Sequence, residues 1–93
     1  MLTLDADLRI PSDVLFTKVE EDAVLLNTRT NKYFALAEVG ARFWALLNEG
    51  RRCREVYEIL LDDYEVDRAD LEKDLLELLT HLMENGLVEV VQA

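Results

Sequence analysis

The hydrophobic pattern of the chain changes after residue 36 from one typical of strands to one typical of helices. Upstream, short runs of β-branched, aromatic and aliphatic residues alternate with polar segments, which predicts three strands at residues 14–19, 23–27 and 32–36. The polar connections are tight, so we expect an antiparallel meander. Asn31 suits the left-handed position of the second turn, because asparagine tolerates a positive φ.

Downstream of residue 36, apolar residues recur at helical spacing and predict helices at about 38–48, 53–63 and 67–85. The third helix has the clearest ends. Asp67 is the expected N-cap, and Asp70 lies close to the free N–H groups of the first turn. Gly86 is expected to end this helix in a Schellman motif, in which Leu87 contacts Leu82.

Two short strands are predicted outside this region, one at Leu8–Ile10 and one at residues 87–91. The element order predicts an α+β fold: a winged helix-turn-helix-like domain with an N-terminal three-stranded antiparallel sheet, three helices and a short C-terminal strand. A chain of 93 residues has room for one core. We therefore expect a single domain over residues 1–93, of which about 1–12 could be flexible.

The strand at residues 32–36 is the last of the predicted meander, so one side of its backbone lacks a neighbouring strand. Either the terminal strand or the N-terminal segment covers this edge, or the edge accepts a peptide as an added strand. The third helix carries two apolar rows, which is more than one packed face requires: Leu71, Leu75, Leu78 and Leu82, and Leu76, Leu79 and Met83. The second interpretation places a bound peptide between this strand and this helix.

The composition of the chain excludes several classes of function. Twenty acidic residues against ten basic ones give a net charge of −10, which disfavours binding to nucleic acid or to an anionic membrane. Cys53 and His81 are the only residues of their kinds and lie on different predicted helices, which argues against a Cys–His catalytic pair and against a zinc site. We expect no enzyme activity, no metal and no cofactor. The start of the chain lacks a signal-peptide pattern, so we also expect a cytoplasmic protein.

Two stretches carry a resemblance to a known family. Lys32-Tyr-Phe-Ala-Leu-Ala-Glu-Val-Gly-Ala-Arg-Phe-Trp-Ala-Leu-Leu47 resembles the "Tyr-Phe-x-Leu-Asn-Glu-x-Gly-x-x-Ile-Trp-x-Leu-Leu" signature of PqqD-like proteins. Asp74-Leu-Leu-Glu-Leu-Leu-Thr-His-Leu-Met-Glu-Asn-Gly-Leu-Val88 resembles the third helix of that family. The resemblance covers about residues 14–91. Ala37 departs from the signature, which has Asn there, and the missing N-cap is expected to cost the first helix ~1 kcal/mol.

The resemblance implies a RiPP precursor recognition element, a winged-helix module that binds the leader of a ribosomally synthesised precursor peptide. In that family the leader adds antiparallel to the third strand and lies against the third helix. The strand-side peptide-binding candidates are then Tyr33, Phe34, Ala35 and Leu36, and the helix-side candidates are Asp70, Leu71, Asp74, Leu75 and Leu78. Tyr33 and Phe34 face opposite sides of the sheet, so one of them is expected to lie in the core.

A chain of this length is most similar to the stand-alone leader-binding proteins of lasso peptide biosynthesis. The partners that this resemblance implies are the precursor leader and a separate leader peptidase and cyclase, without nucleic acid or membrane. Three alternatives stay open: a PqqD-type chaperone that delivers its precursor to a radical SAM enzyme in PQQ biosynthesis, an acidic winged-helix regulatory protein, and a dimerisation module that uses the same sheet edge.

Overall fold

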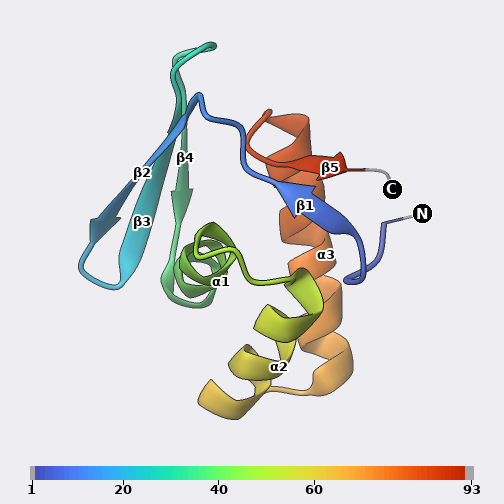
Figure 1. Ribbon diagram of the computed structural model, residues 1–93. Coiled ribbons are helices and arrows are strands. Elements are labelled where there is room, and N and C mark those ends of the chain that lie inside the picture. Colours follow the sequence, from blue (N-terminus) through green and yellow to red (C-terminus); the bar gives the residue numbers. More distant parts are fainter. Residues whose placement is uncertain (1, 92–93) are drawn as a thin grey trace.

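The computed structural model describes residues 2–91 and contains two small sheets and three helices (Figure 1). The elements, in chain order, are β1 (Asp7–Arg9), β2 (Val14–Val19), β3 (Asp22–Asn27), β4 (Lys32–Leu36), α1 (Glu38–Asn48), α2 (Cys53–Asp63), α3 (Arg68–Glu84) and β5 (Glu89–Val91). The predicted winged-helix-like α+β fold is confirmed. None of the helices in the described part of the chain is long and apolar enough to cross a membrane.

The larger sheet is the predicted meander, with strand order β2-β3-β4 and antiparallel pairing throughout. Asn31 takes the left-handed conformation in the turn before β4, with a φ of 60°. The smaller sheet pairs β1 with β5, so that Asp7 stands opposite Val91. The terminal strand therefore does not cover β4, which stays an edge of the meander.

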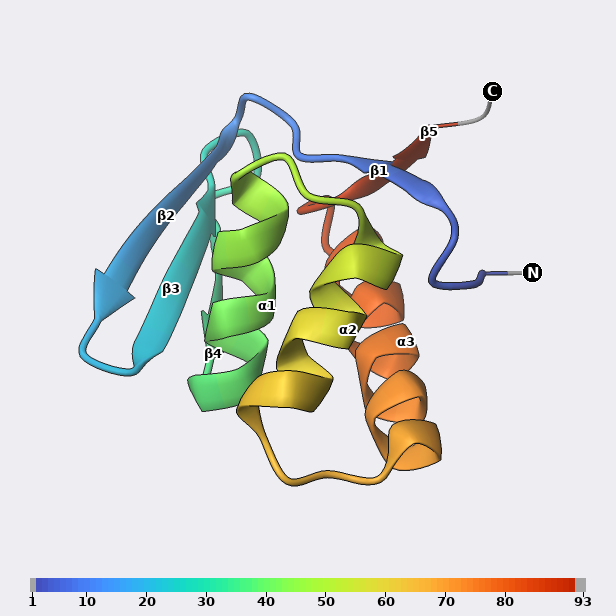
Figure 2. The ribbon, with the colours of Figure 1, turned by 60° about the horizontal axis from the view of Figure 1, so that its bottom comes forward.

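The helices pack against the meander and against one another to form the core. In Figure 1, α1 lies between the β2–β4 sheet and the other two helices, and Figure 2 shows all three helices side by side. Phe43 and Trp44 of α1 are fully buried on the two sides of this helix: Phe43 belongs to a cluster with α2 and α3, and Trp44 to a cluster with the sheet and the end of α3. Because α1 contacts every layer, it fixes the distance between the sheet and α3.

Both ends of α3 form as the sequence predicts. The Asp67 carboxylate accepts hydrogen bonds from the N–H groups of Ala69 and Asp70, at 2.9 and 3.2 Å. At the C-terminus, Gly86 has a φ of 69°, and the N–H of Leu87 donates to the carbonyl of Leu82, as in a Schellman motif.

A buried asparagine joins the end of α3 to the turn before β4. The side chain of Asn27 is 1% exposed, and its amide N–H group donates to the carbonyl of Gly86 at 3.2 Å. Its side-chain oxygen accepts from the N–H groups of Arg29 and Thr30 in the turn. Buried polar groups need such partners to offset the loss of water. Asn27 thereby ties the β3–β4 hairpin to the C-terminal end of α3.

The N-terminal segment lies along the helices. Leu4 is 1% exposed and belongs to the core cluster formed with α2 and α3. The Asp5 carboxylate accepts two hydrogen bonds from the guanidinium of Arg54, and Asp7 pairs with Arg52 at 2.7 Å. The segment proposed from the sequence as a flexible start thus has packing contacts from Leu2 onward.

Candidate functional site

The free edge of β4 presents backbone groups in a defined alternation. The N–H of Thr28 donates to the carbonyl of Asp13 at 2.8 Å, which places the even-numbered residues of β3 in hydrogen-bonded pairs with β2. The odd-numbered residues of β3 then bond toward β4, where their partners carry even numbers. The N–H and C=O groups of Tyr33 and Ala35 therefore point away from the sheet. An incoming strand would find two donors and two acceptors there.

The side chains of β4 divide between solvent and core as the alternation requires. Tyr33 is 73% exposed and Ala35 is exposed, whereas Phe34 is half-buried against the cluster around Trp44. Leu36 is 5% exposed and belongs to that cluster. Of the two neighbouring aromatic residues, Phe34 is thus the one that faces the core.

A groove with a volume of about 430 Å³ lies between the start of α1 and the first half of α3. We call it the α1–α3 groove. Its walls include all five helix-side residues predicted from the sequence: Asp70, Leu71, Asp74, Leu75 and Leu78. It is completed by Val39 and Gly40 of α1 and by the loop residues Glu65, Val66 and Asp67.

Gly40 links this groove to the edge strand. A methyl group at Gly40 would lie 3.5 Å from Cδ2 of Leu36 and 3.6 Å from Cδ2 of Leu78. The end of β4 and the wall of α3 therefore approach one another across this glycine. A larger side chain at this position would fill the space between them.

The helix-side residues play different parts in the groove. Leu71 and Leu75 are 4% and 2% exposed and belong to the core, so they form its floor. Leu78 is half-buried and packs against both core clusters, which leaves part of its side chain open to a ligand. Asp70 and Asp74 are exposed and form the rim. The contact of each of these residues with a peptide stays a prediction.

The start of α1 shows how the missing N-cap at Ala37 is compensated. Ala37 has an extended conformation and offers no side-chain acceptor to the helix. A carboxylate oxygen of Asp22, at the start of β3, instead accepts from the N–H of Glu38 at 3.4 Å. One free helix donor is thus satisfied from the sheet, and α1 begins directly after β4.

Sequence reasoning missed the residues that shape the groove from the α1 side and from the loop. Gly40 stands within the quoted signature, but a glycine in a helix does not reveal which two side chains meet above it. Val39, Val66 and Glu65 were not among the residues predicted to bind a peptide. Only the three-dimensional approach of α1 to α3 brings them together.

Cys53 and His81 lie in different environments. Cys53 is buried in the first turn of α2, and burial raises the pKa of its thiol to about 11, so that the thiol stays protonated at neutral pH. His81 is exposed near the end of α3. Within residues 2–91, no group of three or more His, Cys, Asp or Glu residues is placed to hold a metal ion.

Comparison with known protein families identifies the chain. Residues 22–88, well over half of its length, match the family described as "Coenzyme PQQ synthesis protein D (PqqD)". The chain belongs to the PqqD family. A comparison with curated proteins finds no match.

Two solved structures are similar to this PqqD-family chain over nearly all of its length. "TbiB1 in Complex with the TbiA(beta) Leader Peptide" is 35% identical with a TM-score of 0.85, and the alignment covers 91% of this chain and 99% of that one. "Lasso peptide synthetase B1 complexed with the leader peptide" is 31% identical with a TM-score of 0.79, and covers 90% of this chain and 99% of that one. Both similar proteins were solved with a leader peptide bound.

Proposed function

We propose that this PqqD-family chain binds the leader of a ribosomally synthesised precursor peptide in lasso peptide maturation, without catalysing a reaction itself. The leader adds as a strand to β4 and lies against α3, in contact with the residues that line both elements. The observation that carries the proposal is the open edge of β4 beside the α1–α3 groove. The two similar structures, each solved with a leader peptide, support the same ligand class.

Strand addition suits the division of groups at this site. The outward N–H and C=O groups of Tyr33 and Ala35 supply hydrogen bonds that any peptide sequence can make, and the groove supplies contacts that depend on the side chains of the peptide. Affinity then comes mainly from the backbone and the apolar floor. We expect dissociation constants on the order of micromolar or tighter, which corresponds to about −8 kcal/mol or better.

The same arrangement explains how a protein of this size can serve enzymes that it does not contain. The bound leader occupies the edge of β4 and the α1–α3 groove. The rest of the precursor extends from the site into solution. A separate leader peptidase and a cyclase can then act on that free part. The protonated thiol of Cys53 is a poor nucleophile, which agrees with a binding role.

The proposal is tested by hydrogen exchange measured by NMR, with the TbiA(beta) leader peptide and peptides selected from a random display library as ligands. Without peptide, the amides of Tyr33 and Ala35 exchange quickly because they face solvent. With bound peptide, exchange at both positions is expected to slow by about tenfold or more, because each N–H becomes part of a ladder. The amide of Lys18, which faces outward on the other edge of the sheet, serves as the control and keeps its rate.

Two results would contradict the proposal. The first is that neither the TbiA(beta) leader nor any selected peptide binds. The second is that a peptide binds while the amides of Tyr33 and Ala35 exchange as quickly as before. The second result would move the ligand to another surface of the domain.

A further inference from the structure

The rim of the α1–α3 groove carries charge of one sign only. Four acidic residues line the groove, Glu65, Asp67, Asp70 and Asp74, and no basic residue does. Asp67 is engaged as the N-cap of α3. The other three carboxylates form no ion pair within residues 2–91.

Elsewhere on the molecule, nearly all of the guanidinium groups are matched by carboxylates. Of the seven arginines in the sequence, all except Arg29 lie within ion-pair distance of an Asp or Glu. The basic cluster at residues 51–54 is an example, because its arginines pair with acidic residues of the N-terminal segment, of α2 and of α3. The paired arginines are therefore engaged away from the groove, and the acidic residues that line it have no basic partner among residues 2–91.

The position of Asp74 adds to this contrast. Asp70 lies in the first turn of α3, where its charge interacts favourably with the helix dipole. Asp74 lies one turn further along, beyond the reach of that effect, and has the like charge of Asp70 at the i,i−4 position. Such a pair destabilises a helix slightly. Asp74 thus gains nothing from its own helix, and a cationic ligand would relieve the repulsion.

We propose that the leader carries a lysine or arginine next to an apolar side chain, and that this pair of residues occupies the α1–α3 groove. The inference rests on the proposed function and names the chemistry of the peptide that the site selects. The apolar side chain packs on Leu71, Leu75 and Leu78, and the cation reaches Asp74 and Asp70 on the rim.

The geometry also places this pair of residues within the leader. β4 runs from Lys32 to Leu36 and ends beside the groove, where Leu36 and Leu78 approach across Gly40. A strand that pairs antiparallel with β4, the more stable arrangement per residue, runs the opposite way. Its N-terminal end therefore lies at the groove. The basic and apolar residues precede the segment that forms the added strand.

The test uses three synthetic peptides that share an apolar residue followed by a strand-forming segment and differ only in the preceding residue, which is Lys, Gln or Glu. Fluorescence polarisation of labelled peptide measures affinity. We expect the Lys peptide to bind most tightly, the Gln peptide less tightly and the Glu peptide most weakly. The dissociation constants of successive peptides should differ by about two- to fivefold, because an exposed ion pair contributes about this much to affinity. The differences shrink as salt is raised.

A charge reversal completes the experiment. Asp74→Lys is expected to reverse the order of the Lys and Glu peptides, whereas the control Glu77→Lys, on the same helix but lining a separate hollow, keeps the wild-type order. The inference is overturned if wild-type protein binds the three peptides equally, or if Glu77→Lys reverses the order as well. The variant Leu78→Asp separates this inference from the proposed function. If Leu78→Asp no longer binds the peptides, the proposed function stands even when the charge preference is absent. If Leu78→Asp binds them as tightly as the wild type, the proposed function itself is contradicted.

Discussion

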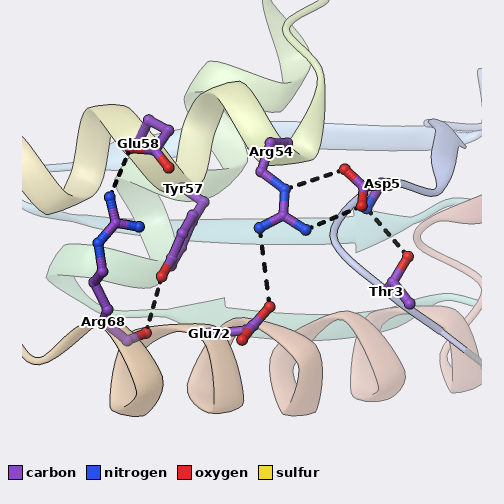
Figure 3. Close-up of polar contacts among 7 residues, drawn as sticks. All are labelled: Thr3, Asp5, Arg54, Tyr57, Glu58, Arg68 and Glu72. Atoms are coloured by element: carbon purple, nitrogen blue, oxygen red, sulfur yellow. Dashed lines mark hydrogen bonds and ion pairs between the residues drawn. The ribbon is translucent and has the colours of Figure 1, made fainter.

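The two long sides of α3 differ in how their polar groups are satisfied. One side meets α2 in what we call the α2–α3 seam, formed by Asp5, Arg54, Tyr57, Glu58, Arg68 and Glu72 (Figure 3). There the hydroxyl of Tyr57 donates to the carbonyl of Arg68 at 3.0 Å, and the Arg68 guanidinium donates to Glu58 at 3.2 Å. The other side of α3 forms the α1–α3 groove, whose rim carboxylates have no such partners.

The side of α3 in the seam is thus held by contacts within the domain, whereas the proposed function assigns the side in the groove to the ligand. In the seam, every charged group drawn in Figure 3 has a partner in the same molecule, and Arg54 joins the N-terminal segment to α2 and α3 through Asp5 and Glu72. In the groove, the Asp70 and Asp74 carboxylates form no ion pair among residues 2–91, and along β4 the outward backbone groups have no neighbouring strand. Substitutions in the seam should therefore change stability, and substitutions in the groove should change binding.

The largest effect is expected for Leu78→Asp. The substitution places a charge on the wall that, under the proposed function, contacts an apolar side chain of the leader, and burying an unpaired charge is strongly unfavourable. Binding of a peptide to which the wild type binds, measured by fluorescence polarisation, should weaken on the order of 100-fold or more.

Leu76→Asp is the matched control, because Leu76 is also half-buried on α3 but lines a hollow away from the groove. Both variants should melt at similar temperatures, and only Leu78→Asp should lose binding. Equal losses in the two variants would mean that the change acts through the fold and not through the groove.

A smaller effect is expected for Ala35→Pro. Proline removes the outward N–H of Ala35, which has no role in the meander, so the domain should stay folded. The loss of one hydrogen bond and the bulk of the ring should weaken leader binding by about tenfold. Lys18→Pro removes the corresponding outward N–H on β2, the other edge of the sheet. If Lys18→Pro reduced affinity as much as Ala35→Pro, the choice of edge would be wrong.

The smallest effect is expected in the seam, and it depends on pH. Hydrogen bonds from the Arg54 guanidinium lower the pKa of the Asp5 carboxyl group. A carboxyl group with a lowered pKa stabilises the fold above its unfolded pKa and ceases to do so as the pH falls through the folded value. Asp5→Asn should therefore lower the melting temperature slightly at neutral pH. The difference from wild type should begin to shrink near the unfolded pKa of about 4 and disappear as the pH falls further, through the lower folded pKa.

Asp62→Asn provides the comparison, since Asp62 is exposed and forms no ion pair among the described residues. It should melt like the wild type at both pH values. Leader binding should be unchanged in both variants, and a loss of affinity in Asp5→Asn would remove the distinction between the two sides of α3.

Local signals were enough to predict most of the fold. The alternating runs predict the meander, and the ends of α3 follow from Asp67 and Gly86, because caps act within a few residues of the chain. The helix-side candidates from Asp70 to Leu78 also line one groove, since residues three and four apart share a helix face.

Features that depend on distant partners could not be predicted in this way. The N–H of Glu38 donates to the Asp22 carboxylate, and this hydrogen bond replaces the N-cap that Ala37 cannot provide. It joins the start of α1 to the start of β3, which lie close together only in the folded sheet. The role of Asn27 likewise depends on its contact with Gly86, at the far end of the chain. The state of the β4 edge was open for the same reason, because it depends on β5 pairing with β1.

The pairing of β1 with β5 has a practical consequence for protein engineering. Because Asp7 stands opposite Val91, the first and last strands of the described chain lie side by side at one place. Figure 2 shows this place at the opposite end of the helices from the start of α3, where the groove lies. The domain is thus suited to fusion at either end, or to insertion into a surface loop of an enzyme. A short flexible linker would then hold a captured peptide near that enzyme at an effective concentration on the order of millimolar.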